Sequence, residues 1–361
     1  MGNKTYKFKP DWLHLVPPGK SIIKAMKELG LSQSGLAERT DYTTKHIYKL
    51  VKGEATINAN TALRLEKVLG PPAHFWLNLE NNYREALEKE KEKENLHTQI
   101  DWLKEIPLND MVKLKWVNKV TDKSKQIVEC LKFYGVASIE LWYKQNFKNV
   151  AFKSYEKINK NEVATHTWVR AGEIKASKIS CKPYNKKRLK LLLTKLRNLT
   201  MEENPEKFIP ELKKMCSKVG IAIVFMPTPK GCPIGGATKW LTPEKALLML
   251  SLRYKTNDHL WFSFFHEVAH ILKHNKKLLF LENTKFTNKL ELENDADKFS
   301  RDLLIPKKYI NELQSLKTQK DIKDFAEKIN IASGIVVGRM QHDKLIEFSK
   351  HNNLKIRYKF G

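Results

Sequence analysis

The sequence has no apolar run long enough to cross a bilayer and no closely spaced pair of cysteines. No segment reaches the ~18 uncharged residues that a membrane span needs, and the N-terminus lacks the apolar stretch of a secretory signal. The cysteines lie far apart, with no C-x-x-C pair, which disfavours a disulfide framework. They are Cys130, Cys181, Cys216 and Cys232. We therefore expect a cytoplasmic protein with reduced thiols and no membrane association.

Acidic residues are few relative to basic ones. The chain of 361 residues has 66 Lys and Arg against 40 Asp and Glu, a formal net charge of +26. Such an excess attracts polyanions, either nucleic acid or an acidic membrane surface. A Lys-rich composition also arises in AT-rich genomes, so charge alone does not identify the partner and a motif is needed.

Length and patterning predict a multidomain, mainly α protein. We expect a basic arm at 1–18, an all-α helix-turn-helix domain with a spacer helix at 19–98, a helical middle segment at 99–215 and an α+β domain at 216–361. The middle segment carries no chemical motif. A packing scaffold, a sensor and a toxin-binding surface are the alternatives for it.

Three apolar segments of the last domain predict strands: "VGIAIVFMPTP" (219–229), "IGGATKW" and "KALLMLSLRY". The two glycines of the second segment would let another backbone approach closely. One interpretation is an edge strand that pairs with an extended peptide substrate. The alternative is a glycine that packing requires.

Two short helical blocks near the N-terminus predict a helix-turn-helix. Ser32 can cap the helix "SQSGLAERT" and Thr43 can cap "TTKHIYKLVKG", with the short link "TDY" setting a steep angle between them. The second helix would present Thr and Lys side chains from its first turns, as a helix that enters the major groove does. The alternative is an ordinary helical hairpin with a solvated basic face.

Residues 17 to 84, including "GLSQSGLAERTDYTTKHIYKLVKG" and "ALRLEKVLGPPAHFWLNLENNY", resemble the HigA-type antitoxins of the Xre helix-turn-helix family. The resemblance implies dimers on palindromic operator DNA. The implied base-reading positions are Thr44, Lys45 and Lys49. The implied phosphate-contacting positions are Gln33, Thr43 and Lys52. Asp41 stands in the turn where the family usually has Gly, and Asp tolerates the left-handed conformation better than most residues.

The segment "WFSFFHEVAHILKH" (261–274) combines an apolar helix with an H-E-x-x-H pattern. His266 and His270 lie one helical turn apart on one face, as two ligands of a tetrahedral zinc would. Glu267 is rotated by about 100°, from where it can reach a metal-bound water as general base. The pattern is short enough to arise by chance, so a third ligand is needed.

A second helix, "LELENDADKFSRDLLIP", supplies candidates for that ligand. Glu293 suits the third ligand position, and Asp297, four residues on, could hydrogen-bond a ligand histidine. Glu291 and Asp295 compete for the same duty. His274 is too far along an unbroken helix to be a ligand, so we expect it to be solvent-exposed or to support a ligand.

The paired motifs, with "GGATKW", "ALLMLSLRY" and "DFAEKINIASGIVVGRMQHD", resemble the ImmA/IrrE family of metallo-endopeptidases over about residues 216 to 340. The resemblance implies a gluzincin-like fold and cleavage of a partner repressor. It implies zinc held by His266, His270 and Glu293, with Glu267 as catalytic base. Asp297 stands where the family often has Asn. The candidates for oxyanion stabilisation are Arg253, Tyr254 and His342.

Two functional hypotheses follow from the combination of both halves. In the first, a cytoplasmic regulator binds operator DNA as a homodimer, and its zinc endopeptidase domain cleaves a partner regulator, toxin or repressor. In the second, the chain is a non-catalytic antitoxin or repressor whose peptidase fold binds a toxin or senses a signal.

Overall fold

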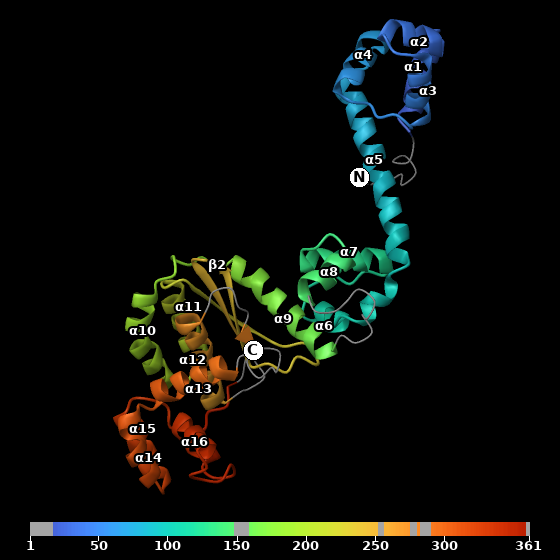
Figure 1. Cartoon of the computed structure of the whole chain (residues 1–361). Helices are drawn as coiled ribbons and strands as arrows, with labels where there is room; N and C mark the ends of the chain where they lie inside the picture. Colours follow the sequence, from blue (N-terminus) through green and yellow to red (C-terminus); the bar gives the residue numbers. More distant parts are fainter. Residues whose placement is uncertain (1–16, 148–158, 252–255, 275–279, 282–289, 359–361) are drawn as a thin grey trace, which may run out of the picture. The chain divides into compact units, whose positions relative to one another are not determined.

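The computed structural model of the chain describes residues 17–147, 159–251, 256–274, 280–281 and 290–358. It divides into two compact units, one comprising Met1–Ile100 with Asp122–Lys125 and the other comprising Asp101–Thr121 with Gln126–Gly361 (Figure 1). Helices dominate both, as the sequence predicts. Among the described residues, no helix is both long and apolar enough to span a membrane. The expected basic arm lies outside the described residues up to position 16.

The first unit is a helical domain. Its elements are α1 (Gly19–Glu28), α2 (Gln33–Thr40), α3 (Thr44–Lys52), α4 (Ala59–Leu69) and α5 (Ala73–His97). Their apolar faces meet in a core that includes Ile22, Leu36, Ile47, Leu65 and Trp76, all with no exposed surface. The last turns of α5 carry exposed Glu–Lys pairs such as Glu88–Lys91 at 2.7 Å, as a solvated helix with mixed charges does.

Two caps fix the helix-turn-helix within this unit. The Ser32 hydroxyl accepts from Gly35 N at 3.0 Å and the Thr43 hydroxyl accepts from His46 N at 3.1 Å, so both predicted caps are confirmed. Asp41 adopts the left-handed conformation, with φ of 55°, in the turn. Its carboxylate also pairs with Arg64 at 3.2 Å, which joins the turn to α4.

A group of short helices follows α5 and belongs to the second unit, apart from Ile100 and the start of α7. These are η2 (Ile100–Lys104), α6 (Leu108–Lys113), α7 (Lys123–Tyr134) and α8 (Ile139–Asn146). Within this unit Trp142 is fully buried and makes edge contacts with Trp102, Tyr134 and Phe147 at centroid separations of 5.3 to 5.5 Å. These four aromatic residues thus pack against one another among the short helices.

A four-stranded sheet with the order β1-β3-β2-β4 lies at the centre of the second unit. Its strands are β1 (Ile221–Met226), β2 (Gly236–Thr242), β3 (Lys245–Ser251) and β4 (Phe280–Leu281). β1 runs parallel to β3, whereas β2 runs antiparallel to both β3 and β4. The three strands that the sequence predicts are confirmed. The fourth strand, β4, was not predicted from the apolar pattern.

Helices cover both faces of this sheet. On one face lies α9 (Lys160–Ser177), which approaches so closely that a Cβ on Gly172 would be 2.1 Å from the sulfur of Met249. On the other face, Leu248 and Leu250 share a core with α12 (Asn257–Lys273). Leucines of α10 (Lys186–Asn198) and α11 (Pro205–Ser217) join this core. The second half of the middle segment therefore packs with the sheet.

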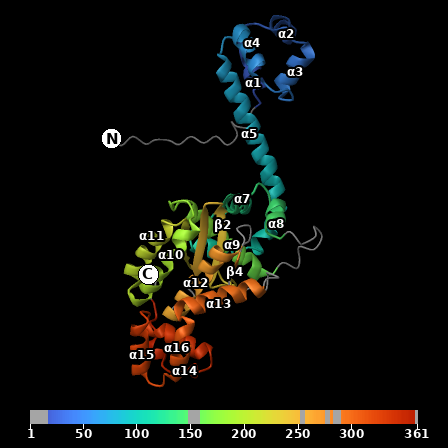
Figure 2. The same ribbon diagram turned by 60° about the vertical axis from the view of Figure 1, so that its left-hand side comes forward.

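The chain ends in a group of helices below α12 (Figure 2). They are α13 (Leu290–Leu304), η5 (Lys307–Tyr309), α14 (Ile310–Ser315), α15 (Gln319–Lys328), α16 (Ser333–His342) and η6 (Asn352–Leu354). A capping box between Thr318 and Asp321 starts α15. The final segment returns to α12, where Lys355 forms an ion pair with Asp258 at 2.6 Å.

Candidate functional site

Helix α12 is buried along almost its whole length and divides into two kinds of surface. Trp261, Phe264 and Phe265 have no exposed surface and pack into the core with the sheet. His266 and His270, one turn apart, face α13 instead, where they contact acidic side chains. The apolar residues thus fix the rotation of the helix about its axis, and this rotation aims both imidazoles at one point.

His266, His270 and Glu293 converge on a common position. The Nε2 atoms of the two histidines are 3.0 Å apart, and Glu293 places Oε2 at 3.1 Å from His266 Nε2 and Oε1 at 3.6 Å from His270 Nε2. Ligands of a tetrahedral ion at zinc–nitrogen distances are separated by about 3.4 Å. The separations of 3.0 to 3.6 Å lie on either side of that value, and a set of nitrogen and oxygen donors suits Zn²⁺.

Each histidine is oriented by a partner on its other ring nitrogen. Asp297 Oδ1 lies 2.8 Å from His266 Nδ1, and His274 Nδ1 lies 2.8 Å from His270 Nδ1. Because a carboxylate accepts hydrogen bonds, His266 donates from Nδ1 to Asp297, and its Nε2 lone pair points into the cluster. Two such lone pairs at 3.0 Å repel each other unless a cation or a proton lies between them.

The electrostatics of the cluster favour ligand forms of these side chains. Burial alone would raise the pKa of Glu293, but the hydrogen bonds and positive charge of His266 and His270 in their protonated forms outweigh it and lower that pKa to about 2. Burial lowers the pKa of His270, against the opposing effect of Glu293. A neutral imidazole and an ionised carboxylate are the protonation states that bind a metal ion.

Glu267 is completely buried between α12 and β2. The Thr238 hydroxyl donates to its Oε2 atom, which fixes the rotation of the carboxylate. A Cβ on Gly236 would lie 2.6 Å from Glu267 Oε1. Glycine is therefore required at the start of β2 because the glutamate occupies the space that a side chain would take.

The expected edge-strand role of "IGGATKW" is wrong for the part of β2 nearest to Glu267. Ala237 and Thr238 pair with β3 on one side and with Leu281 and Phe280 of β4 on the other, so their backbone groups face two strands. The packing alternative holds instead, with Gly236 making room for Glu267. Neither Thr238 nor Gly236 belonged to the predicted site, because a contact between a strand and a helix 29 residues later leaves no local signal.

The competing acidic residues lie outside the cluster. Asp295 pairs with Lys273 at 2.7 Å and lies 3.5 Å from His274 Nε2. Glu291 is exposed in the first turn of α13. Of the two expectations for His274, support of a ligand agrees with its contact to His270.

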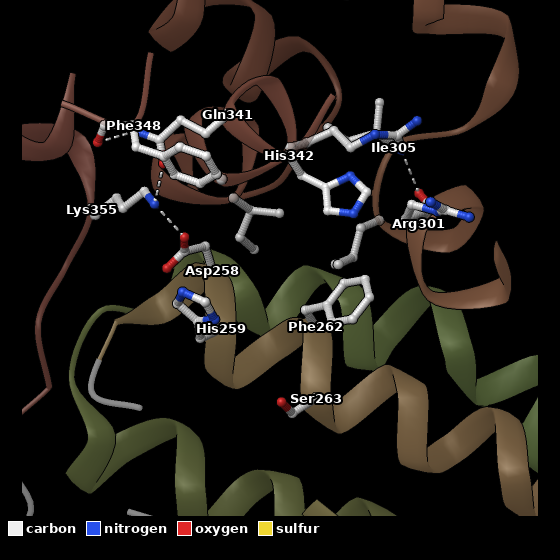
Figure 3. Close-up of a pocket in the computed structure, with 14 residues that line it drawn as sticks. Asp258, His259, Phe262, Ser263, Arg301, Ile305, Gln341, His342, Phe348 and Lys355 are labelled. Carbon is white, nitrogen blue, oxygen red and sulfur yellow. Dashed lines mark hydrogen bonds and ion pairs between the residues drawn. The ribbon is translucent and has the colours of Figure 1, made fainter. Parts of the chain in front are cut away.

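One of the three candidates for oxyanion stabilisation, His342, is described by the structure and does not lie with the cluster. Arg253 and Tyr254 fall outside the described residues. His342 lines a separate pocket of about 430 Å³ between α12, α13 and α16, whose lining includes neither histidine of the cluster. Figure 3 shows His342 across this pocket from Phe262, with the Lys355–Asp258 ion pair at its other side.

The predicted DNA-contacting residues share the outer surface of the helix-turn-helix. Thr44, Lys45 and Lys49 are exposed on α3, while Ile47 and Leu50 of the same helix are buried. Three further predicted residues flank them: Gln33 opens α2, Thr43 caps α3 and Lys52 ends it. The Lys52 ammonium lies over the exposed ring of Tyr48, 5.7 Å from its centroid. The surface thus presents cations and hydroxyls from one short helix.

Comparisons with known proteins identify both halves. Residues 22–75 match the helix-turn-helix family, and residues 216–340 match the IrrE N-terminal-like domain of a peptidase family. The chain therefore carries an Xre-type helix-turn-helix domain and an IrrE-like domain, as the two resemblances predict.

Three individual proteins are similar to the N-terminal part. Virulence-associated protein I of Dichelobacter nodosus is 33% identical over 69 residues, which cover 19% of this chain and 64% of that relative. A HigA-family addiction module antidote protein from Coxiella burnetii is 28% identical, with 23% of this chain and 92% of that chain covered and a TM-score of 0.22. An antidote protein of a plasmid maintenance system from Nostoc punctiforme is also 28% identical, with 22% and 90% covered and a TM-score of 0.21.

Proposed function

We propose that the second unit is a zinc-dependent endopeptidase that cleaves a regulatory partner protein, and that the first unit binds operator DNA. The observation that carries the first proposal is the convergence of His266, His270 and Glu293 beside the buried Glu267. Two buried histidines beside one buried and one partly buried glutamate have a high cost in free energy unless a cation neutralises the carboxylates.

In the proposed reaction the chain holds the ion and moves one proton. His266, His270 and Glu293 would be the ligands, and zinc would supply Lewis acidity toward the scissile carbonyl. Glu267 would accept a proton from the attacking water and pass it to the leaving amine. The hydrogen bond from Thr238 keeps the Glu267 carboxylate in one orientation for both transfers. Asp297 and His274 would hold the imidazoles in place.

The partner is proposed to be a protein that acts in the same regulatory circuit. A domain that binds operator DNA brings the peptidase to a promoter, where repressors and other regulators gather. We propose that the chain acts in the cytoplasm and binds a palindromic operator as a homodimer through Thr44, Lys45 and Lys49. Gln33, Thr43 and Lys52 would contact phosphates.

The peptidase proposal is tested by incubating the full chain, loaded with zinc, with each protein encoded beside it. Wild type should contain about one zinc per chain and produce two or a few discrete fragments of the partner, because each cut by an endopeptidase divides a chain in two. His266→Ala should lose both zinc and cleavage. A zinc-loaded wild type that binds such a partner without cutting it would instead support the non-catalytic antitoxin.

The DNA proposal is tested by fluorescence anisotropy with the promoter upstream of the coding region. Replacing Lys45 and Lys49 by Ala should weaken binding by about 100-fold, since each base contact that is lost is worth about 1–3 kcal/mol. The matched control replaces Lys24 and Lys27, which are exposed on α1. Equal binding by both double variants would show that α3 is not the recognition helix.

A further inference from the structure

The second unit contains one long segment without acidic residues. Between Glu173 and Glu202 the chain has nine Lys and Arg residues and no Asp or Glu. This segment forms the end of α9, a connection and α10, which lies at the outside of the unit beside α11 (Figures 1 and 2). Neither the metal-binding cluster nor the helix-turn-helix uses any of these residues.

Most of these cations point to solvent. The exposed ones are Lys175, Lys178, Lys182, Lys186, Lys187, Arg188, Lys190 and Lys195. Within the described part of the chain, none of these eight forms an ion pair with an acidic side chain. Arg197 instead turns inward, where its Nη2 and Nε atoms donate to the Leu304 carbonyl at 3.0 and 3.1 Å, respectively. The segment therefore presents positive charges that no acidic side chain of the described residues neutralises.

Helix α10 orders this charge on one face. Leu189 and Leu196 are fully buried in the core that contains the sheet, so the opposite side of the helix faces outward. At 100° per residue, that outward side carries Lys187 and Leu191, flanked by Lys190 and Lys195. Leu191 is 81% exposed, the largest exposed fraction among the large apolar side chains of the described residues.

We propose that this α10 face, made of Lys187, Lys190, Leu191 and Lys195, binds the phosphate backbone of nucleic acid. Lys187 and Lys195 are separated by about 12 Å along the helix axis. Successive phosphates of one strand advance about 3.4 Å along a duplex, so flexible lysines over this length can reach several of them. The face lies on a different unit from α3 and is a second contact surface, independent of sequence-specific recognition and of peptidase activity.

Two other partners fit this face less well. A helix that lies in a membrane interface buries a broad apolar face in lipid, but the apolar stripe of α10 is used up in the protein core and only Leu191 points outward. Interfaces with other proteins are depleted in lysine. Phosphates are bound well by lysine ammonium groups that converge without acidic neighbours.

The test measures how salt affects the affinity of the full chain for a duplex of arbitrary sequence. The triple variant Lys187→Gln, Lys190→Gln, Lys195→Gln removes the charges and keeps good helix formers. Its plot of log affinity against log salt should be less steep by about 0.9 per lost phosphate contact. Affinity at 0.1 M salt should fall roughly tenfold or more. The same change should appear when Lys45 and Lys49 are already Ala.

The matched control is Lys317→Gln, Lys320→Gln, Lys323→Gln, which removes three exposed lysines at and before α15 in the same unit. It should leave the slope within experimental error of wild type. An α10 variant with an unchanged slope, or a control that changes it equally, would overturn the proposal. A membrane partner would also overturn the proposal. It would be shown if wild type bound vesicles of anionic lipid and Leu191→Gln abolished this binding without changing the affinity for DNA.

Discussion

At the residue scale, the candidate site depends on contacts that two elements share. Glu267 has its backbone on α12, but its carboxylate is positioned by Thr238 and Gly236 of β2. His266 is likewise positioned by Asp297 of α13. Both side chains are thus held by a second element, which fixes their orientation.

Replacing Gly236 by Val should abolish most peptidase activity while zinc stays bound. The new side chain would collide with Glu267, which must then move away from the attacking water. Loss of a general base typically lowers the rate by about 100-fold or more. The measurement is kcat for partner cleavage together with zinc content, and Thr242→Val at the exposed end of β2 is the control. Normal cleavage by the Gly236 variant would refute this placement of the base.

Asp297→Asn should weaken zinc binding without abolishing it. Removing the charge of a group that orients a ligand histidine typically lowers metal affinity by about 10- to 100-fold. Competition with a chromogenic chelator gives the dissociation constant directly. Asp302→Asn, on the same helix and paired with Lys307 at 3.8 Å, should bind zinc as wild type does. Equal losses in both variants would mean that the effect comes from helix charge alone.

At the element scale, local patterns were predicted well and distant pairings were not. The i,i+4 spacings in α12 and α13, the two caps and the left-handed Asp41 all depend on residues a few positions apart. Three features were not predicted: the short β4 strand, the approach of α9 to Met249, and the contact between Thr238 and Glu267. They join residues that are 29 or more positions apart, or they have no local sequence pattern. Such contacts are decided by packing of the whole unit.

His166 of helix α9 should make the free energy of unfolding depend measurably on pH. Burial, with a smaller effect of Lys239, lowers the pKa of His166 to about 4, whereas an unfolded histidine titrates near 6.5. Below that value the unfolded state binds a proton that the folded state excludes, so the free energy of unfolding falls as the pH falls. Between pH 7 and pH 5 the loss amounts to about 2 kcal/mol.

Urea unfolding of wild type and His166→Gln at both pH values isolates this contribution. The variant should lose less stability than wild type over the interval, and the difference should be close to the expected value. An identical pH dependence in both proteins would show that His166 is protonated at the same pH whether the chain is folded or unfolded.

At the scale of the whole molecule, two compact units combine two different chemistries. The described core of the first unit contains only its own helices, and the proposed ion ligands His266, His270 and Glu293 all belong to the second. A bound ion should therefore stabilise the second unit alone. At an ion concentration of about 1,000 times the dissociation constant, this linkage amounts to about 4 kcal/mol.

Calorimetry of the full chain with and without chelator tests this separation. Chelation should lower the transition of the second unit by several degrees and leave that of the first in place. Intrinsic fluorescence helps the assignment, because Trp261 is buried behind the cluster and Trp76 is in the first core. A uniform shift of the whole profile would contradict independent units.

The central claim is that Glu267 performs peptide-bond cleavage in a regulator that binds DNA. The most direct measurement is mass spectrometry of new protein N-termini in cells that express wild type or Glu267→Gln at equal levels. The account predicts that the variant keeps its zinc and its promoter binding, while a cleavage product of a regulatory protein appears only with wild type. The same set of N-termini in both cells, under conditions where both proteins are loaded with zinc, would contradict it.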